Sequence, residues 1–305
     1  MMMNEPLTFT MLRGTLARDV PLARYTSWRC GGAGERVYVP ADREDLAVFV
    51  HQLPRDEPLT AIGLGSNLLV RDGGIRGTVV VLHAALNTME MRGDVIYAEA
   101  GVASPKVARF AAKNGFAGAE FLAGIPGTVG GALAMNAGCY GGETWNHVTG
   151  VEVLTRAGIF EQRSPAAYAI GYRSVRRASG DARDGIFTAA WLTFPKGDAH
   201  AARVRIAELL RKRLATQPLN LPNSGSVFRN PPGDHAARLI ESCGLKGYTI
   251  GGARVSEKHA NFIVNPEGMA KAAHIEAIIE HVRTTVRERT GIDLEPEVQI
   301  IGGCV

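Results

Sequence analysis

Two glycine-rich segments are the part of this sequence whose residue types best suit the binding of an anion. The longer one, residues 124–138, reads Gly-Ile-Pro-Gly-Thr-Val-Gly-Gly-Ala-Leu-Ala-Met-Asn-Ala-Gly and carries no charge. Glycine tolerates positive φ and lets the backbone approach a ligand closely, and successive N–H groups can form a concave nest for a diphosphate. We therefore expect an anion-binding loop and no ordinary helix or strand here; a tight buried turn is the alternative.

The shorter segment, Gly63-Leu64-Gly65-Ser66-Asn67, looks at first like a dinucleotide-binding fingerprint. Leu68, however, stands where the third glycine belongs, and the residues that follow predict a strand and a turn instead of a helix. A Rossmann site needs a helix N-terminus at the pyrophosphate, so that site is excluded, and the sequence has no GxxxxGK[ST] phosphate loop. What remains is two glycine-rich loops, one before and one after a predicted helix, which could close on a diphosphate from both sides.

Three polar residues in other parts of the chain could do chemistry, but their types alone leave their roles open. Arg173 follows Gly171-Tyr172, Ser226 stands in a proline-bounded loop, and Glu297 leads into an apolar segment. Each has an ordinary explanation as a surface cation, a turn hydroxyl bonded to nearby backbone, or a solvated glutamate. No GxSxG elbow surrounds Ser226, so hydrolase chemistry has little support.

The composition indicates a globular protein and excludes several classes. At 305 residues the chain suggests two domains, and its 46% hydrophobic and 21% charged residues are close to the globular norm. The formal charge of +4 decides nothing about partners. Four widely spaced cysteines without a CxxC pair indicate neither a metal site nor a disulfide framework. Without a signal peptide or a long apolar run, we expect a cytoplasmic protein that does not enter the membrane.

Hydrophobic periodicity predicts mixed α and β structure throughout. Before residue 198 we expect helices at 42–53 and 104–115 and strands at 35–40, 59–62, 68–70, 78–82, 95–100, 151–154, 159–162 and 186–194. A helix at about 198–216, which carries five arginines and lysines among apolar residues, ends before Pro218 and marks a boundary. Beyond it we expect a compact α/β domain with helices near 235–243 and 269–290 and strands at 261–264 and 297–301.

Taken together, seven short motifs in order resemble the UDP-N-acetylenolpyruvoylglucosamine reductase family. The resemblance runs from about residue 20 onward, and although each motif is weak by itself, the ordered set is specific. The direct run through residues 169–175 is similar to the shorter, second type of this family. The motifs are Tyr25-Thr26-Ser27 with Gly31-Gly32, and residues 63–70, 124–138, 171–173, 225–231, 255–262 and 294–302.

The resemblance implies an α+β flavoenzyme of peptidoglycan precursor synthesis. Residues 1–19 would be an N-terminal extension, 20–197 an FAD-binding domain of the vanillyl-alcohol-oxidase (PCMH) type with two subdomains split near 83–94, and 198–305 a C-terminal α/β substrate-binding domain. NADPH would reduce the bound FAD, which then reduces UDP-N-acetylglucosamine enolpyruvate to UDP-N-acetylmuramate. The same resemblance implies no metal, and we expect a monomer without a nucleic-acid partner.

The resemblance also assigns the site residues. Arg173 and Glu297 would lie at the substrate carboxylate and Ser226 would donate the proton. Glu297 helps there only if its proton is retained or shared, because an ionised glutamate would repel the developing charge. FAD binding is assigned to Tyr25, Gly63, Leu64, Gly65, Ser66, Asn67, Leu68, Gly124, Ile125, Pro126, Gly127, Thr128, Gly130, Gly131, Asn136, Ala137 and Gly138, and substrate binding to Tyr172, Asn230, Lys258 and His259.

One departure from the family pattern concerns the residues after Arg173. The family reads Tyr-Arg-x-Ser, whereas Ser174 here stands one place early, so the role of that serine is open. His259 is equally well explained as a packed histidine. No nicotinamide motif separate from the flavin site is visible, so the sequence does not distinguish NADPH from NADH.

Two alternative functions were weighed against this one. A flavin-dependent oxidase or dehydrogenase of a small alcohol or hydroxy acid would have the same fold, but would not need Ser226 and Glu297 to protonate a carbanion. A nucleic-acid-binding protein would use the basic helix at 198–216. That helix is half apolar and has no aromatic platform beside it, and charge runs are usually solvated faces.

Overall fold

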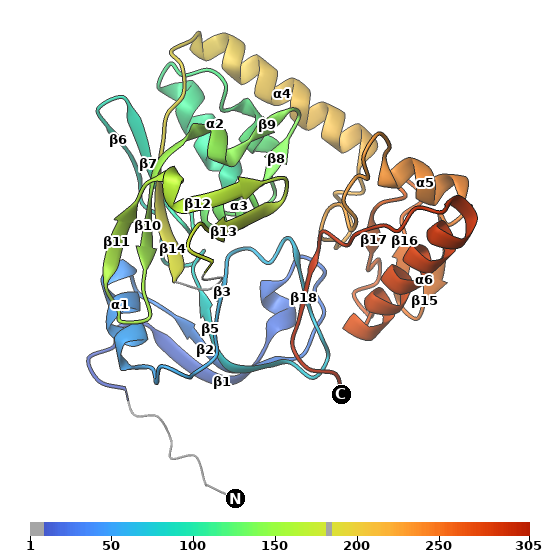
Figure 1. Cartoon of the computed structure of the whole chain (residues 1–305), viewed down its shortest axis with the longest axis horizontal. Coiled ribbons are helices and arrows are strands. Elements are labelled where there is room, and N and C mark those ends of the chain that lie inside the picture. The colour runs from blue at the N-terminus through green and yellow to red at the C-terminus, as the bar shows by residue number, and fades with distance from the viewer. Residues whose placement is uncertain (1–8, 181–184) are drawn as a thin grey trace, which may run out of the picture.

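The computed structural model describes residues 9–180 and 185–305, and it contains two main sheets followed by a separate C-terminal unit (Figure 1). The first sheet has the strand order β1-β2-β5-β3. β1 runs antiparallel to β2, whereas the pairs β2–β5 and β5–β3 are parallel. Its strands are β1 (Thr15–Pro21), β2 (Ala33–Val39), β5 (Ile75–Val81) and β3 (Leu59–Ile62).

Helix α1 (Arg43–Gln52) covers this sheet and begins where the sequence predicts. The carboxylate of Asp42 accepts a hydrogen bond from the backbone N–H of Asp45, which caps the first turn. On the buried face of the helix, the ring of Phe49 stacks on Tyr38 of β2 with centroids 3.9 Å apart. The apolar stripe read from the sequence is therefore the face that packs on the sheet.

The described N-terminal end of the chain packs against the first sheet. β1 pairs with β2 from Thr15 onward, and Phe9 and Leu12 pack against the core that contains α1. The predicted N-terminal extension over residues 1–19 stays a prediction. Residues 1–8 lie outside the described part of the chain.

The second sheet is antiparallel, with the order β11-β10-β14-β7-β6, and follows the first sheet after Val81. Helix α2 (Ser104–Lys113) and α4 (Ala199–Thr216) share its hydrophobic core, and α4 extends across the top of the molecule to the C-terminal unit (Figure 1). The strands are β6 (Met89–Arg92), β7 (Val95–Glu99), β10 (Val148–Leu154), β11 (Phe160–Arg163) and β14 (Ile186–Leu192).

The long glycine-rich segment contains a helix, which corrects the expectation that it forms none. α3 (Val129–Met135) begins at Thr128, whose hydroxyl accepts a hydrogen bond from the N–H of Gly131, and ends at Asn136 with φ of 41°. Alanine, leucine and methionine in its last four positions are good helix formers, and they outweigh the two glycines because both ends are capped. The glycines thus lie near the ends of the segment and in the first turn of α3.

Several short elements connect these parts. The hairpin of β12 (Tyr168–Gly171) and β13 (Ser174–Arg177) was not predicted, nor were the two-residue strands β8 (Gly138–Cys139) and β9 (Gly142–Glu143). The 3-10 turns are η1 (Leu22–Tyr25), η2 (Glu120–Gly124), η3 (Thr144–His147) and η4 (Pro165–Ala167).

The C-terminal unit packs helices against a small antiparallel sheet. Its core also includes Trp28, Cys30 and Leu69 from the N-terminal part, and the indole N–H of Trp28 donates to the carbonyl of Ile263 at 2.7 Å. The domain boundary near residue 197 stays a prediction, because α4 packs in the core of the second sheet while Trp28 packs in the core of the C-terminal unit. The elements are α5 (Ala236–Ser242), α6 (Ala272–Thr290), β15 (Thr249–Ile250), β16 (Ala253–Val255) and β17 (Ile263–Val264).

A parallel pair of strands joins the two ends of the fold. β18 (Gln299–Ile301) follows the C-terminal unit, yet it pairs in register with β4 (Leu68–Val70) of the N-terminal part. Beside this pair, Arg71 makes a bidentate ion pair with Glu276 of α6, and the carboxylate of Asp72 accepts from the first backbone N–H groups of α6. The C-terminal unit is therefore fixed against the strand that follows the short glycine loop.

No helix among the described residues is long and apolar enough to span a membrane.

Candidate active site

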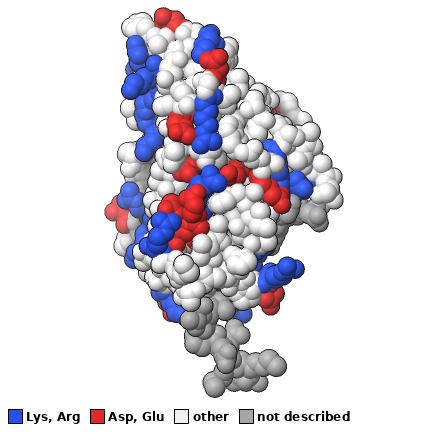
Figure 2. Space-filling view, turned by 90° about the vertical axis from the view of Figure 1, so that its left-hand side faces the viewer, with Lys and Arg blue, Asp and Glu red and all other residues white. Residues whose placement is uncertain are grey.

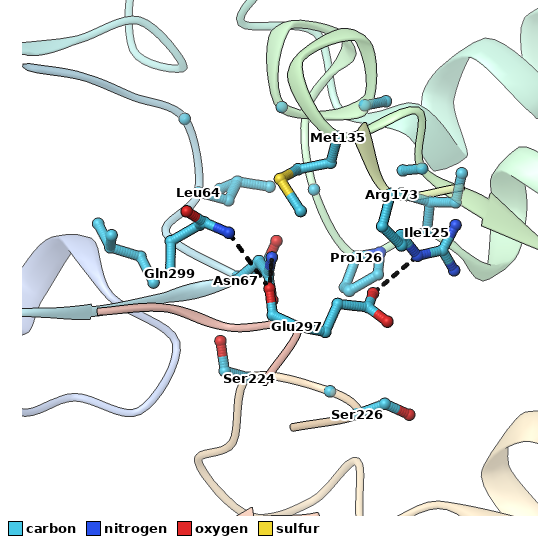
Figure 3. A pocket seen from close by; sticks show the side chains of 18 of the residues that line it. Leu64, Asn67, Ile125, Pro126, Met135, Arg173, Ser224, Ser226, Glu297 and Gln299 are labelled. Atoms are coloured by element: carbon cyan, nitrogen blue, oxygen red, sulfur yellow. Dashed lines mark hydrogen bonds and ion pairs between the residues drawn. The ribbon is translucent and has the colours of Figure 1, made fainter. Parts of the chain in front are cut away.

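One cavity of about 510 Å³ lies between the N-terminal sheets and the C-terminal unit, and Figure 3 shows it from close by. The segments that line it include the loop after β3, the segment from η2 through α3 to β8, the turn of the β12–β13 hairpin, the end of α4, the loop around Ser226, Phe262, and β18 with the residues before it. The strands and helices described above thus bring together residues as far apart in the sequence as Thr60 and Ile301. Both glycine-rich segments and all three polar residues singled out in the sequence are among the lining residues.

The two glycine-rich loops lie against each other at one wall of this cavity. A Cβ atom on Gly63 would overlap the hydroxyl of Thr128, and one on Gly127 would lie 3.1 Å from the hydroxyl of Ser66. The glycines therefore permit a close approach of one loop to the other. This packing fits both the anion-binding loop and the tight buried turn that the sequence left open, because the buried contact also shapes the loop that faces the cavity.

The loop between β3 and β4 presents a row of backbone amides. Within the described residues, the N–H groups of Leu64, Gly65, Ser66 and Asn67 donate no hydrogen bond to a protein acceptor. Gly65 has φ of 58°, which turns the loop into the left-handed region at its centre. Successive free amides around such a residue form the kind of concavity that binds the oxygens of a phosphate group.

Gly65 provides a direct test of this loop. In a Gly65→Ala variant the new Cβ would overlap the carbonyl oxygen of Tyr25, and the left-handed backbone would be strained. We expect the loop to shift and FAD to bind about tenfold or more weakly, as measured by titrating the flavin-free protein with FAD. Gly303→Ala is the matched control, because its added Cβ would meet no atom within 4 Å. Equal FAD affinity in the two variants would contradict a role of this loop in binding FAD.

Arg173 reaches the cavity from the turn of the β12–β13 hairpin. Gly171 pairs with Ser174, which leaves Tyr172 and Arg173 as the turn residues, and Arg173 has φ of 52°. Non-glycine residues in this region carry a cost in free energy, and they are concentrated at functional sites. Arg173 donates from Nη1 to the carbonyl of Asn136 at 3.3 Å and from Nη2 to that of Gly138 at 2.9 Å, so the end of α3 fixes the guanidinium.

Arg173 and Glu297 form an ion pair inside the cavity. Nε of Arg173 donates to Oε1 of Glu297 at 2.8 Å, and each side chain is only 16% exposed. Figure 3 shows the two groups facing each other from opposite elements. A guanidinium has five N–H donors, and three of them are used in the contacts above, so two remain for an anionic ligand.

The backbone around Glu297 is held by residues of two other segments. The side-chain amide of Asn67 donates to the carbonyl of Glu297 at 3.1 Å, and the N–H of Glu297 donates to the carbonyl of Val227 at 2.7 Å. Glu297 is therefore tied to the short glycine loop on one side and to the segment that carries Ser226 on the other.

Ser226 lies in a loop whose conformation is fixed on both sides. Gly225 before it has φ of 73°, and its N–H donates to the side-chain oxygen of Asn223 at 2.9 Å. After it, the side chain of Asn261 pairs with both the N–H and the carbonyl of Phe228. The Ser226 hydroxyl makes no hydrogen bond within the described residues and lines the cavity, so it is free to contact a ligand.

Most of the residues assigned from the sequence line this cavity, whereas five do not. Tyr25 and Gly130 lie behind the glycine loops, and Asn136 is buried at the end of α3. Lys258 donates from Nζ to the carbonyl of Leu214 at the end of α4, and His259 packs edge-on against Phe262. Burial lowers the pKa of His259, which fits the alternative of a packed histidine. The roles assigned to all the site residues, whether they line the cavity or not, stay predictions.

The structure also brings residues to the cavity that the sequence did not single out. Arg213 of α4 lines it without an acidic partner among the described residues, and donates from Nε to the side-chain oxygen of Gln217 at 2.8 Å. Burial lowers the pKa of Arg213. Ser224, Met135 and Gln299 line the cavity as well. The sequence could predict that Arg213 lies on a helix. It could not predict that Arg213 faces the cavity, because that direction depends on how the helix packs.

The surface seen from the left side of Figure 1 carries mixed charges (Figure 2). Basic and acidic side chains adjoin each other over much of this face. Ion pairs occur within single strands, between Arg92 and Glu90 on β6 and between Arg163 and Glu161 on β11. The basic residues predicted on α4 do not form one continuous basic surface. Arg205 pairs with Glu208, whereas Arg213 lines the cavity.

Comparison with protein families gives two matches that together cover most of the chain. Residues 35–162 match a family model described as an FAD binding domain. Residues 217–301 match one described as the C-terminal domain of UDP-N-acetylenolpyruvoylglucosamine reductase. The first contains both glycine-rich segments, and the second contains Ser226 and Glu297.

Full-length relatives agree with these matches. A UDP-N-acetylenolpyruvoylglucosamine reductase of Nitrosospira multiformis is 56% identical, with 98% of this chain and 92% of the relative aligned. One of Thiobacillus denitrificans is 53% identical over 97% of this chain and 94% of the relative. The crystal structure of the reductase from Thermus caldophilus superposes with a TM-score of 0.80 at 34% identity, covering 95% and 99% of the two chains. The predicted α+β fold with an FAD-binding domain and a C-terminal domain is confirmed, whereas the vanillyl-alcohol-oxidase type of the FAD-binding domain stays a prediction.

Proposed function

This chain belongs to the UDP-N-acetylenolpyruvoylglucosamine reductase family, and from that membership we propose that it reduces UDP-N-acetylglucosamine enolpyruvate to UDP-N-acetylmuramate in peptidoglycan precursor synthesis. It is an FAD-dependent oxidoreductase, and NADPH supplies the hydride. The family match confirms the resemblance read from the motifs. It also favours this reaction over oxidation of a small alcohol on the same fold.

The observation that carries the proposal is the single cavity in which the glycine loops meet the Arg173–Glu297 pair and Ser226. A redox cofactor and the group it reduces must be in contact, and only a shared cavity provides this. A cation, a carboxylate and a hydroxyl beside the cofactor loops are the groups needed to stabilise and then protonate a reduced carbon.

The residues at the glycine-rich wall suit FAD. The free amides of residues 64–67 would hold the diphosphate, and the 124–128 loop, whose Gly127 approaches Ser66, would close on it from the other side. The buried hydroxyl of Ser224, a residue that lines the same cavity, has no hydrogen-bond partner in the described part of the chain and also suits a polar ligand. When bound, FAD would supply the hydride, taken from NADPH, that reduces the enolpyruvyl carbon.

Arg173 stabilises the negative charge that develops on the substrate. Its two remaining N–H groups would hold the carboxylate of the enolpyruvyl group, while Asn136 and Gly138 keep the guanidinium in place. Glu297 pairs with this guanidinium and helps to hold it at the cavity, and the expectation that Glu297 retains or shares a proton stays a prediction.

Ser226 completes the reaction by donating its proton to the carbon that carries the negative charge. A serine hydroxyl is a weak acid, but a carbanion is a strong base, so the position of the hydroxyl matters more than its acidity. The fixed loop and the absence of a competing partner in the described structure support this role. Arg213, a buried cation in the same cavity, would neutralise a phosphate of the UDP group.

The experiment that tests the function uses the purified protein and two measurements. Its visible spectrum should show bound flavin, or flavin should be taken up when FAD is added. NADPH oxidation should then depend on the enolpyruvyl UDP-sugar and yield UDP-N-acetylmuramate. A protein that takes up no flavin would refute both oxidoreductase assignments, whereas a flavoprotein that oxidises NADPH only with an alcohol or hydroxy acid would favour the alternative.

We also propose that the protein acts as a monomer in the cytoplasm. All the cavity-lining residues named above belong to one chain, so a second copy is not needed to complete the site. UDP-sugars and NADPH are compounds of the cell interior, which fits the predicted location.

A further inference from the structure

Ser224 has a buried hydroxyl that the reaction described above does not use. The residue is 4% exposed, and its Oγ makes no hydrogen bond within the described structure. It lines the same cavity as Ser226. A buried hydroxyl without a partner is unfavourable, because it has lost its hydrogen bonds to water and gained none in return. Such a group in a ligand cavity indicates that a ligand atom completes it.

The position of Ser224 separates it from the groups that act on the substrate. In Figure 3, Ser224 lies on the side of Asn67 and Gln299, whereas Ser226 lies on the side of Arg173 and points away from Ser224. Gly225 between the two serines has φ of 73°, so the chain turns sharply there and the two hydroxyls face different parts of the cavity. One ligand group near Ser226 does not account for Ser224.

We propose that the hydroxyl of Ser224 donates a hydrogen bond to the polar edge of the flavin ring and positions the ring beside the substrate. This rests on the proposed function through the assignment of FAD to this cavity. The diphosphate would be held by the amides of residues 64–67, which form the cofactor loop. The ring must lie within reach of Arg173, Ser226 and Glu297, and Ser224 adjoins these residues from the side of the cofactor loop.

The neighbours of Ser224 support a contact to a flat ring with a polar edge. Phe228 and Phe262 line the cavity from the same C-terminal unit and are nearly fully buried, so part of this wall is apolar. A ring carbonyl or ring nitrogen that enters such a wall needs a donor, and a serine hydroxyl supplies one. Ser224 is thus a positioning residue for the cofactor and takes no part in proton transfer to the substrate.

The test compares flavin-free Ser224→Ala with the flavin-free native chain. We expect FAD to bind Ser224→Ala about tenfold more weakly, which corresponds to about 1.4 kcal/mol. The melting temperature of the flavin-free variant should be equal or higher, because removing an unsatisfied hydroxyl does not destabilise the protein. Ser164→Ala, at an exposed site outside the cavity, should change neither quantity.

Two results would overturn the proposal. Unchanged FAD affinity in Ser224→Ala would mean that solvent or protein satisfies the hydroxyl, and a lower melting temperature without FAD would mean that it is a structural group. Weaker binding of the UDP-sugar with unchanged FAD affinity would assign it to the substrate, against the proposal. If the native chain itself binds no FAD, the proposed function fails, so the two failures are distinguishable.

Discussion

Replacing Ser226 by alanine should slow reduction of the enolpyruvyl UDP-sugar by about 10²–10⁴-fold, the usual range for loss of a positioned general acid. Reduction of the bound flavin by NADPH should stay within about twofold of the native rate, because that half-reaction requires no proton from Ser226. Rapid-mixing measurements that follow the flavin absorbance measure the two half-reactions separately. The hydroxyl forms no hydrogen bond within residues 9–180 and 185–305, so the variant should fold normally.

Two further variants make this result specific. Ser226→Cys retains a proton that can be donated and should recover part of the lost rate, which a purely structural role would not explain. Ser164→Ala, an exposed serine remote from the cavity, should leave both half-reactions unchanged. If Ser226→Ala slowed both half-reactions equally, the assignment as proton donor would be wrong, and an effect on the flavin itself would be the explanation.

The second large effect is expected at Arg173, even when the positive charge is kept. Arg173→Lys should lower kcat/KM for the UDP-sugar by about 10²–10³-fold, as for loss of a donor that stabilises charge in the transition state. A lysine ammonium cannot bond Glu297, Asn136, Gly138 and a substrate carboxylate together, because it has only three donors. Steady-state kinetics with each substrate varied in turn would measure this loss.

The control for Arg173 lies on the same hairpin. Arg176→Lys changes an exposed arginine of β13 and should leave kcat/KM within about twofold, since exposed charges contribute little. Combining Arg173→Lys with Glu297→Gln tests whether the two act as a pair, because the losses should then be smaller than additive. Additive losses, or a normal rate in Arg173→Lys, would contradict the proposed division of roles.

How much of this site could be predicted depends on how local each signal is. The glycine loops were visible because glycine and proline restrict the backbone wherever they occur. Arg173, Ser226 and Glu297 were ambiguous as single residues and gained roles only through an ordered set of motifs. The helix α3 was missed because its caps, Thr128 and Asn136, lie inside a segment that otherwise favours turns.

Other features could not be predicted because they depend on contacts between distant residues. The inward direction of Arg213 is set by the packing of α4 on α2 and η2, since either face of that helix carries basic residues. The hairpin that carries Arg173 has exposed, mixed side chains and lacks the alternation that predicts a strand. The pairing of β18 with β4 joins residues as far apart in the sequence as Leu68 and Gln299, and no local pattern specifies such a partner.

That strand pair also bears on the order in which the molecule is built. Contacts between residues far apart in the sequence require the closure of a long loop, and such contacts tend to form late in folding. The two sheets and α1 rest on contacts of shorter range, so they can assemble before β18 reaches β4. Since β18 adjoins Glu297 and supports the loop that contains Asn67, the flavin pocket is expected to be among the last parts to form. FAD would then bind only to chains that have finished folding, and its binding would stabilise those folded chains.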